Sequence, residues 1–341
     1  MKIQRGKCYL SAMMRVFLFR FLLVLSLPPG FGFSFGAQAQ SPFRVARTWE
    51  TAMQHPNEVE ELYLSGIRLS ALPPEVGKLV NLRKLILHGN QLARLPKELA
   101  ALTRLREINL NGNRFAEFPK ALLSLAALEH LAIGDNLLTG IPLTISRLSS
   151  LKSLDLHRNR LTVFPAGLLQ LMALERLDLA NNGITRLPAN LGQLAGLQSL
   201  MLSHNQFARF PPEILQLTQL RELYLGKNRI QKLPGQIMCL AQLQSLMLAD
   251  NLFAVFPVAV LQLTQLRELY LNGNQLKTIP DEITQLAELR ALGLDNNQLT
   301  ALPDSMQNLS GLRVLYLSNN PLPTIQRDKI MSQLTATHVE F

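Results

Sequence analysis

Six side chains near the middle of the chain have the types and spacing needed for acid–base or metal chemistry. They are His130, Asp155, His157, Arg158, Arg176 and Asp178. Paired carboxylates beside histidines can hold a metal ion or transfer protons. On neighbouring strands, the two carboxylates would lie about 5 Å apart. The arginines can neutralise the same carboxylates, so we interpret the group as a solvated ion-pair patch and expect no catalytic, cofactor or metal site.

Other catalytic signals are missing from the sequence. It contains no GxSxG, HExxH, paired CxxC, P-loop or GxGxxG motif. Of its two cysteines, Cys8 lies near the start and Cys239 lies in the second half. Cys239 is expected at a partly exposed outer position, as a free thiol without a disulfide partner. These observations predict a protein that is not an enzyme.

The elements that must position these side chains follow from a strict sequence repeat. Eleven asparagines and eleven prolines recur every 23 residues without insertion or deletion, the prolines running from Pro73 to Pro303. A fixed period of this length is typical of a solenoid, in which one small unit is stacked many times. The asparagines are Asn90, Asn113, Asn136, Asn159, Asn182, Asn205, Asn228, Asn251, Asn274, Asn297 and Asn320.

Each unit reads LxxLxLxxNxLxx[LF]PxxLxxLxx, and its two halves predict different structures. The LxL stretch alternates with period two, which predicts a short strand with one buried face. The later half, as in Pro96–Leu105, spaces leucines by three, which favours a 3₁₀ or other helical segment. We expect the asparagine to satisfy backbone groups buried in the turn after the strand, because its side chain carries both a carbonyl and an amide.

This pattern resembles the leucine-rich repeat family, in the 23-residue class whose outer segment begins with Leu-Pro. Plant intracellular Ras-group-related repeat proteins and many bacterial repeat proteins share it. The resemblance covers residues 59–322, about twelve units, although Ile67 replaces the asparagine of the first. It implies an α/β solenoid shaped as a horseshoe, with a concave parallel sheet of about 12 strands and helical or 3₁₀ segments on the convex side. It implies much less about function.

Residues 1–39 have the composition of a secretory signal peptide. Basic residues precede a nearly apolar stretch at 16–27, and Ala37-Gln38-Ala39 matches a small-residue cleavage site. We predict cleavage after Ala39 and a secreted or periplasmic protein. A cytoplasmic signalling scaffold is the alternative if this leader is a wrongly assigned start. The true start is left open among three methionines, Met1, Met13 and Met14.

Short segments on either side of the repeats are expected to cover the ends of the solenoid. Within 40–58, apolar residues spaced by three to four predict a helical N-terminal cap across 44–54, with Trp49 laid on the first repeat. Within 323–341, a C-terminal cap is expected from a helix across 324–334 and an edge strand over 338–341. The side chains expected to face inward from that helix are Ile325, Ile330, Met331 and Leu334.

The residues four positions before each asparagine are expected to point out of the concave face. In the C-terminal half this column contains Met201, Tyr224, Met247, Tyr270 and, after one glycine, Tyr316. Exposed tyrosine and methionine in a groove are typical of protein interfaces. A polar rim beside them is expected from Ser199, Glu222, Ser245 and Glu268. We therefore predict a scaffold that binds a protein or peptide here. The alternative is that these side chains only cover one another.

Net charge argues against other classes of partner. The formal charge is +10, but five of the 34 cations lie in residues 1–39, which leaves 29 against 24 acidic residues. No run of basic residues and no basic–aromatic pattern occurs, so we expect no nucleic-acid binding. No segment after residue 39 is apolar enough for a stable membrane span. A surface adhesion protein is a further alternative, and the oligomeric state is left open.

Overall fold

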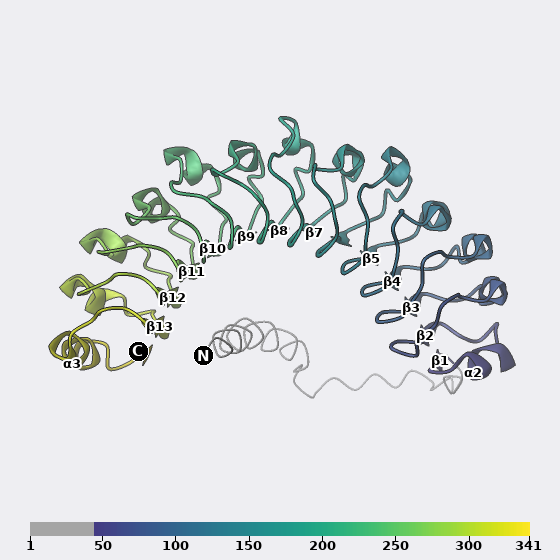
Figure 1. The fold of residues 1–341 in the computed structure, drawn as a ribbon, viewed down its shortest axis with the longest axis horizontal. Coiled ribbons are helices and arrows are strands. Elements are labelled where there is room, and N and C mark those ends of the chain that lie inside the picture. Colours follow the sequence, from purple (N-terminus) through teal and green to yellow (C-terminus); the bar gives the residue numbers. More distant parts are fainter. Residues whose placement is uncertain (1–43) are drawn as a thin grey trace, which may run out of the picture. The chain divides into compact units, whose positions relative to one another are not determined.

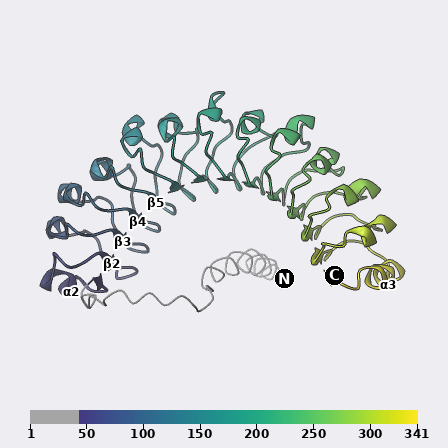
Figure 2. The ribbon, with the colours of Figure 1, turned by 180° about the vertical axis from the view of Figure 1, so that it is seen from behind.

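The computed structural model describes residues 44–341. The predicted signal peptide, its cleavage site and Cys8 lie outside the described residues. Residues 44–341 form an open arc of stacked repeats, in which the strands line the inner side and short helical turns line the outer side (Figure 1). The same arrangement is seen from behind in Figure 2. The predicted horseshoe is therefore confirmed.

Fourteen strands within residues 44–341 form one parallel sheet in chain order. Each repeat strand pairs in register with the next, so that Leu85 lies opposite Ile108, 23 residues later. Twelve strands belong to the repeats and one more comes from each cap. The strands are β1 (Val45–Ala46), β2 (Glu61–Tyr63), β3 (Lys84–Ile86), β4 (Glu107–Asn109), β5 (His130–Ala132), β6 (Ser153–Asp155), β7 (Arg176–Asp178), β8 (Ser199–Met201), β9 (Glu222–Tyr224), β10 (Ser245–Met247), β11 (Glu268–Tyr270), β12 (Ala291–Gly293), β13 (Val314–Tyr316) and β14 (His338–Glu340).

Short 3₁₀ helices cover the convex side. Most begin directly after the repeat proline, whose fixed φ and missing N–H suit the start of a helical turn. The 3₁₀ helices are η1 (Pro74–Lys78), η2 (Lys97–Ala101), η3 (Lys120–Ser124), η4 (Leu143–Arg147), η5 (Ala166–Gln170), η6 (Leu191–Gln193), η7 (Pro212–Gln216), η8 (Gly235–Cys239), η9 (Val258–Gln262), η10 (Asp281–Gln285) and η11 (Asp304–Asn308). Cys239 ends η8 and is exposed, with a free thiol.

A continuous apolar core fills the space between the sheet and the 3₁₀ helices. The repeat leucines, such as Leu85, Leu87 and Leu92, are fully buried. Phenylalanines at 46-residue spacing before the proline, such as Phe210 and Phe256, are buried among them. Burial of this apolar surface supplies the main driving force for stacking, because each repeat hides its own leucines only when it has a neighbour.

The repeat asparagines form a ladder of hydrogen bonds with backbone groups. Asn205 is typical: its Oδ1 accepts from the Ile184 N–H at 3.0 Å, while its Nδ2 donates to the Leu179 carbonyl at 2.9 Å and to the Leu202 carbonyl at 3.1 Å. Ile184 and Leu179 belong to the preceding repeat. Each amide therefore links two repeats through their backbones and satisfies polar groups that would otherwise lack partners in the turn.

The N-terminal cap differs from its predicted form. We expected a helix across 44–54, but Val45 and Ala46 add strand β1 to the edge of β2. The helix α2 (Trp49–Gln54) begins only after Thr48, whose side chain accepts a hydrogen bond from the Thr51 N–H. Pairing with the open sheet edge outweighs helical periodicity before that residue. Trp49 is half-buried and packs against the core.

The C-terminal cap consists of α3 (Thr324–Gln333) and β14. Strand β14 pairs with β13, and the Leu317 N–H donates to the Glu340 carbonyl at 2.7 Å. Ile330 and Leu334 are buried, as expected. The expectation for the other two apolar side chains is wrong, since Ile325 is 74% exposed and Met331 is 53% exposed. The inward face of α3 is therefore narrower than its apolar residues indicate.

Candidate functional site

The concave face carries the column of side chains that lies four residues before each asparagine. We call Met201, Tyr224, Met247 and Tyr270 the tyrosine–methionine stripe. They occupy β8 to β11 and pair in register, Met201 with Tyr224, Tyr224 with Met247 and Met247 with Tyr270. Each is half-buried. The stripe is thus one unbroken row of large side chains across four neighbouring strands, each with part of its surface accessible.

Gly293 allows the row to continue to Tyr316. This glycine lies in register between Tyr270 and Tyr316. A Cβ atom at Gly293 would lie 2.6 Å from Cδ1 of the Tyr270 ring, so any larger residue would displace that ring. The two tyrosine rings lie 6.4 Å apart between centroids, tilted by 32°. Burial, with the nearby carboxylates of Glu340 and Asp295, raises the pKa of the Tyr316 hydroxyl.

The polar rim beside the stripe differs from its predicted form. Ser199 and Ser245 are buried, with 3% and 1% of their surface exposed. Each hydroxyl donates to the glutamate of the next strand at 3.0 Å, Ser199 to Glu222 and Ser245 to Glu268. The buried serine hydroxyls therefore fix the orientation of the half-buried glutamate carboxylates. Of the four predicted rim residues, only the two glutamates offer accessible polar groups.

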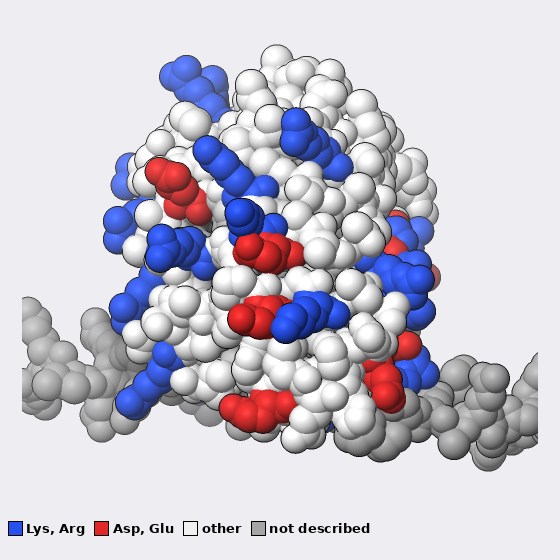
Figure 3. Space-filling view, turned by 90° about the vertical axis from the view of Figure 1, so that its right-hand side faces the viewer, with Lys and Arg blue, Asp and Glu red and all other residues white. Residues whose placement is uncertain are grey.

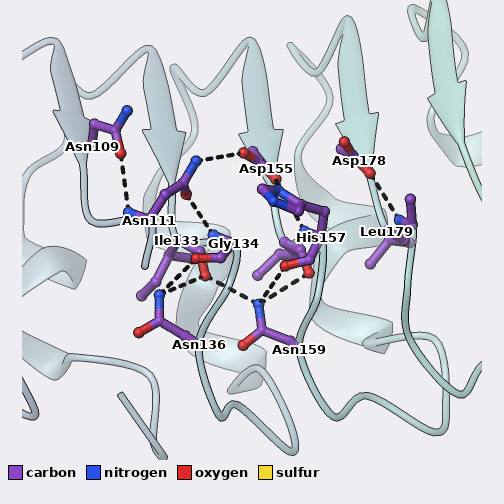
Figure 4. A network of polar contacts seen from close by, with 12 residues as sticks. Asn109, Asn111, Ile133, Gly134, Asn136, Asp155, His157, Asn159, Asp178 and Leu179 are labelled. Atoms are coloured by element: carbon purple, nitrogen blue, oxygen red, sulfur yellow. Dashed lines mark hydrogen bonds and ion pairs between the residues drawn. The ribbon is translucent and has the colours of Figure 1, made fainter. Parts of the chain in front are cut away.

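A second group of polar side chains lies at the ends of β6 and β7. Asp155, His157 and Asp178 each offer a ligand atom within 4.8 Å of the others. The Nδ1 of His157 lies 2.6 Å from Oδ1 of Asp155, and Figure 4 shows these two side chains turned towards each other. Asp155 and Asp178 lie in register on neighbouring strands. We call these three residues the Asp–His–Asp cluster.

Burial and the contacts within the cluster shift the pKa values of its side chains in opposite directions. Burial acts to raise the pKa of Asp155, but the hydrogen bonds and charge of His157 hold it below its usual value. Its hydrogen bond with Asp155 raises the pKa of His157 in turn. Burial, together with the charge of Asp155, raises the pKa of Asp178 to about 6. The second carboxylate is therefore the group that the cluster accommodates least well in its charged form.

The prediction that the two arginines neutralise the cluster carboxylates is wrong. Within residues 44–341, neither Arg158 nor Arg176 forms an ion pair with Asp155 or Asp178. Arg158 lies in the turn after β6 with a φ of 48°, a conformation that few residues other than glycine and asparagine adopt. His130 is exposed in β5 and does not join the cluster.

Two residues that sequence reasoning missed support the cluster. The Nδ2 of Asn111 donates to Oδ2 of Asp155 at 2.9 Å, and its Oδ1 accepts from the Gly134 N–H at 2.6 Å. A Cβ atom at Gly134 would lie 2.2 Å from Nδ1 of His157, so the glycine makes room for the imidazole. Both lie, like His157, two residues before a ladder asparagine. Reading that column across repeats would have brought the three together.

The remaining charges of the N-terminal repeats are interspersed. Ion pairs join neighbouring repeats, as in Lys84–Glu107 at 2.9 Å and Lys152–Glu129 at 2.7 Å. Figure 3 shows acidic side chains lying among basic ones on the side of the arc that faces right in Figure 1. Among the described residues, no helix combines the length and hydrophobicity that crossing a membrane requires.

Comparison with protein families shows where the repeats are matched. Residues 212–335 match the model described as leucine-rich repeat region, and residues 57–115 and 149–207 match the model described as leucine rich repeat. No curated protein matches the chain in sequence.

Solved structures with the same architecture cover most of the chain. A leucine-rich repeat protein of Leptospira interrogans is 28% identical, with a TM-score of 0.66, over 87% of this chain and 99% of that one. An internalin, InlF of Listeria monocytogenes, is 21% identical, with a TM-score of 0.69, over 84% and 88%. A chain in the octameric complex of latrophilin 3, Unc5D and the leucine-rich repeats of FLRT2 is 25% identical, with a TM-score of 0.63, over 80% and 87%.

Proposed function

The chain belongs to the leucine-rich repeat family, and from that premise we propose that it is a non-catalytic scaffold that binds a protein or peptide on its concave face. The observation that carries the proposal is the tyrosine–methionine stripe. Tyrosine and methionine offer large apolar contact areas, and tyrosine adds a hydroxyl that can hydrogen-bond at the edge of an interface. The FLRT2 repeats, which share this architecture, are themselves part of a multiprotein complex.

The dimensions of the stripe suit an extended segment of a ligand. Neighbouring strands are about 4.8 Å apart, so Met201 to Tyr270 spans about 14 Å and Tyr316 extends the row to about 24 Å. An extended chain rises about 3.3 Å per residue, so the row matches roughly four to seven residues. The ladder and core hold the strands in one register, so the binding surface is preorganised before the ligand arrives.

Glu222 and Glu268 give the stripe one charged margin. Both carboxylates are held by a buried serine hydroxyl, which limits their freedom to turn away. A ligand that places basic or amide groups beside its apolar contacts would complement this margin. We therefore propose a ligand that is mixed in character, with apolar groups over the stripe and hydrogen-bond donors over the glutamates.

Capture of a ligand by variant proteins tests the stripe. Replacing both Tyr224 and Tyr270 with serine is expected to abolish capture from native extract, because it removes the two largest contact areas. Tyr63→Ser is the matched control, since Tyr63 occupies the same column in β2 and is also half-buried. Quantitative mass spectrometry of the captured proteins gives the measurement. Equal capture by the wild type and the double variant would refute the proposal.

We also propose that the protein is exported, on the evidence of residues 1–39. N-terminal sequencing of the mature protein is expected to begin at Gln40. A cytoplasmic protein with its leader intact would contradict export and would favour an intracellular signalling scaffold instead. Surface adhesion is a third possibility that shares the binding face, and it predicts that the protein stays with the cell after export.

A further inference from the structure

The Asp–His–Asp cluster has the composition and spacing of a metal site. Its three side chains offer two carboxylate oxygens and one imidazole nitrogen, all within 4.8 Å of one another. In a tetrahedral zinc site, ligand atoms about 2.0–2.2 Å from the ion lie about 3.4 Å apart. Small side-chain rotations, with no change in the strands, would therefore bring all three atoms within coordination distance of a single ion.

The surrounding residues hold these ligands in place. Asp155 receives a hydrogen bond from Asn111, which is itself fixed by the Gly134 N–H. One oxygen of Asp178 accepts from the Ala180 N–H at 2.8 Å, and within residues 44–341 the other oxygen has no hydrogen-bond partner. Metal-binding carboxylates are typically oriented by such outer hydrogen bonds. In Asp178 they leave one oxygen for the ion, whereas in Asp155 the Oδ1 that would bind the ion also accepts from the His157 N–H.

The charge balance also favours a cation at this point. Two partly buried carboxylates lie in register on adjacent strands, and no lysine or arginine of the described residues forms an ion pair with either. Among residues 44–341, His157 is the one basic side chain that hydrogen-bonds either carboxylate: it contacts Asp155 directly and interacts with Asp178 only through its charge. A divalent ion would neutralise both carboxylates at once.

We propose that Asp155, His157 and Asp178 bind one divalent transition-metal ion on the concave face. Mixed imidazole and carboxylate ligands suit zinc better than calcium or magnesium, which prefer all-oxygen sites. Three protein ligands leave at least one coordination position open to water. Met201 lies in register with Asp178, so the ion would border the tyrosine–methionine stripe.

Zinc titration of the purified chain, stripped of metal with a chelator, tests this site. Calorimetry is expected to show one zinc ion per chain, and saturating zinc is expected to raise the thermal unfolding midpoint, because the ion binds only the folded state. Asp178→Asn and His157→Gln are each expected to weaken binding by at least about tenfold, since each removes a ligand. The carboxamide introduced by Asp178→Asn retains an oxygen that accepts from the Ala180 N–H, so this variant should fold.

Two controls make the result specific. Asp295→Asn removes a half-buried carboxylate from the column that contains His157 and should leave zinc affinity unchanged. Cys239→Ser removes the exposed thiol as a competing ligand. Circular dichroism without metal verifies that the variants are folded. Absence of a zinc site, or wild-type affinity in both Asp178→Asn and His157→Gln, would overturn the proposal.

Discussion

At the scale of single residues, the ladder asparagines satisfy backbone groups that an apolar side chain of the same size would leave unpaired. Asn205 pairs with one N–H and three carbonyl groups of the backbone in a buried turn. Unpaired polar groups in such a place cost about 1–3 kcal/mol each. The asparagine is therefore tied to the stability of the stack, not to ligand recognition.

Replacing Asn205 with leucine is expected to lower the free energy of unfolding by about 1–3 kcal/mol or more, because it strands those backbone groups. Urea denaturation gives the measurement. Gln206→Leu is the control: Gln206 is the next residue, its side chain is exposed, and its substitution should change stability by less than about 0.5 kcal/mol. If the Asn205 variant were as stable as the control, the ladder hydrogen bonds would make no measurable contribution to the free energy of unfolding.

Asp295 makes a prediction about pH. Burial raises its pKa to about 6, while hydrogen bonds from the Ser318 N–H and from Asn272 act against that rise. The folded state therefore holds the proton more tightly than the unfolded state does. This stabilisation is present below about pH 4 and is lost as the pH rises through about 6.

Asp295→Asn should remove that dependence. At pH 7 the variant is expected to be more stable than the wild type by about 1 kcal/mol, after allowance for solvent screening of a half-exposed group. At pH 4 the two should be equally stable. Urea denaturation at both pH values measures the difference. A variant that is less stable at pH 7 would show that the charged carboxylate contributes favourably to the fold.

Residue-level contacts were predictable only where the repeat defines them. The ladder could be inferred because eleven copies hold one register. The partners of Arg158 and Arg176 could not, because strand order does not determine the direction in which a long side chain turns. The three residues of the Asp–His–Asp cluster could be identified from the sequence. The residues that support them could not, since Asn111 and Gly134 belong to two other repeats.

At the scale of elements, each of the first eleven repeats pairs a three-residue strand with a short 3₁₀ helix, and the last strand, β13, is followed by α3. The strands and the 3₁₀ helices are too short to be stable alone, so their stability comes from packing against neighbours. Sequence periodicity locates them well because period two and period three differ clearly. The caps are less predictable. Each has only one copy, and contact with the open end of the sheet overrides the local helical pattern, as at Val45 and Ala46.

Helix α3 offers a direct test of its packing. Ile330→Ala is expected to lower the local opening free energy of the C-terminal cap by about 2 kcal/mol, because it removes buried apolar surface. Amide hydrogen exchange of β14 should then be about 30-fold faster. Ile325→Ala, on the same helix but at an exposed position, should change exchange very little. Equal effects of the two substitutions would contradict the packing of α3.

At the scale of the whole molecule, the repeats convert a local sequence pattern into one continuous surface. Figure 1 shows the strands side by side along the inner side of the arc. Because neighbouring strands pair in register, each column of side chains follows a single line along that face. The architecture could be predicted from the period alone. The ligand could not, because the period describes how repeats stack and contains no information about what contacts their accessible side chains.

The central claim is that the tyrosine–methionine stripe binds a ligand. Its most direct test is the dissociation constant of the captured ligand for three proteins: the wild type, the Tyr224→Ser, Tyr270→Ser double variant and the Tyr63→Ser control. Central tyrosines in interfaces commonly contribute about 2 kcal/mol each, so the double variant should bind roughly 1000-fold more weakly, and the control as tightly as the wild type. A dissociation constant for the double variant within about twofold of the wild type would contradict the claim.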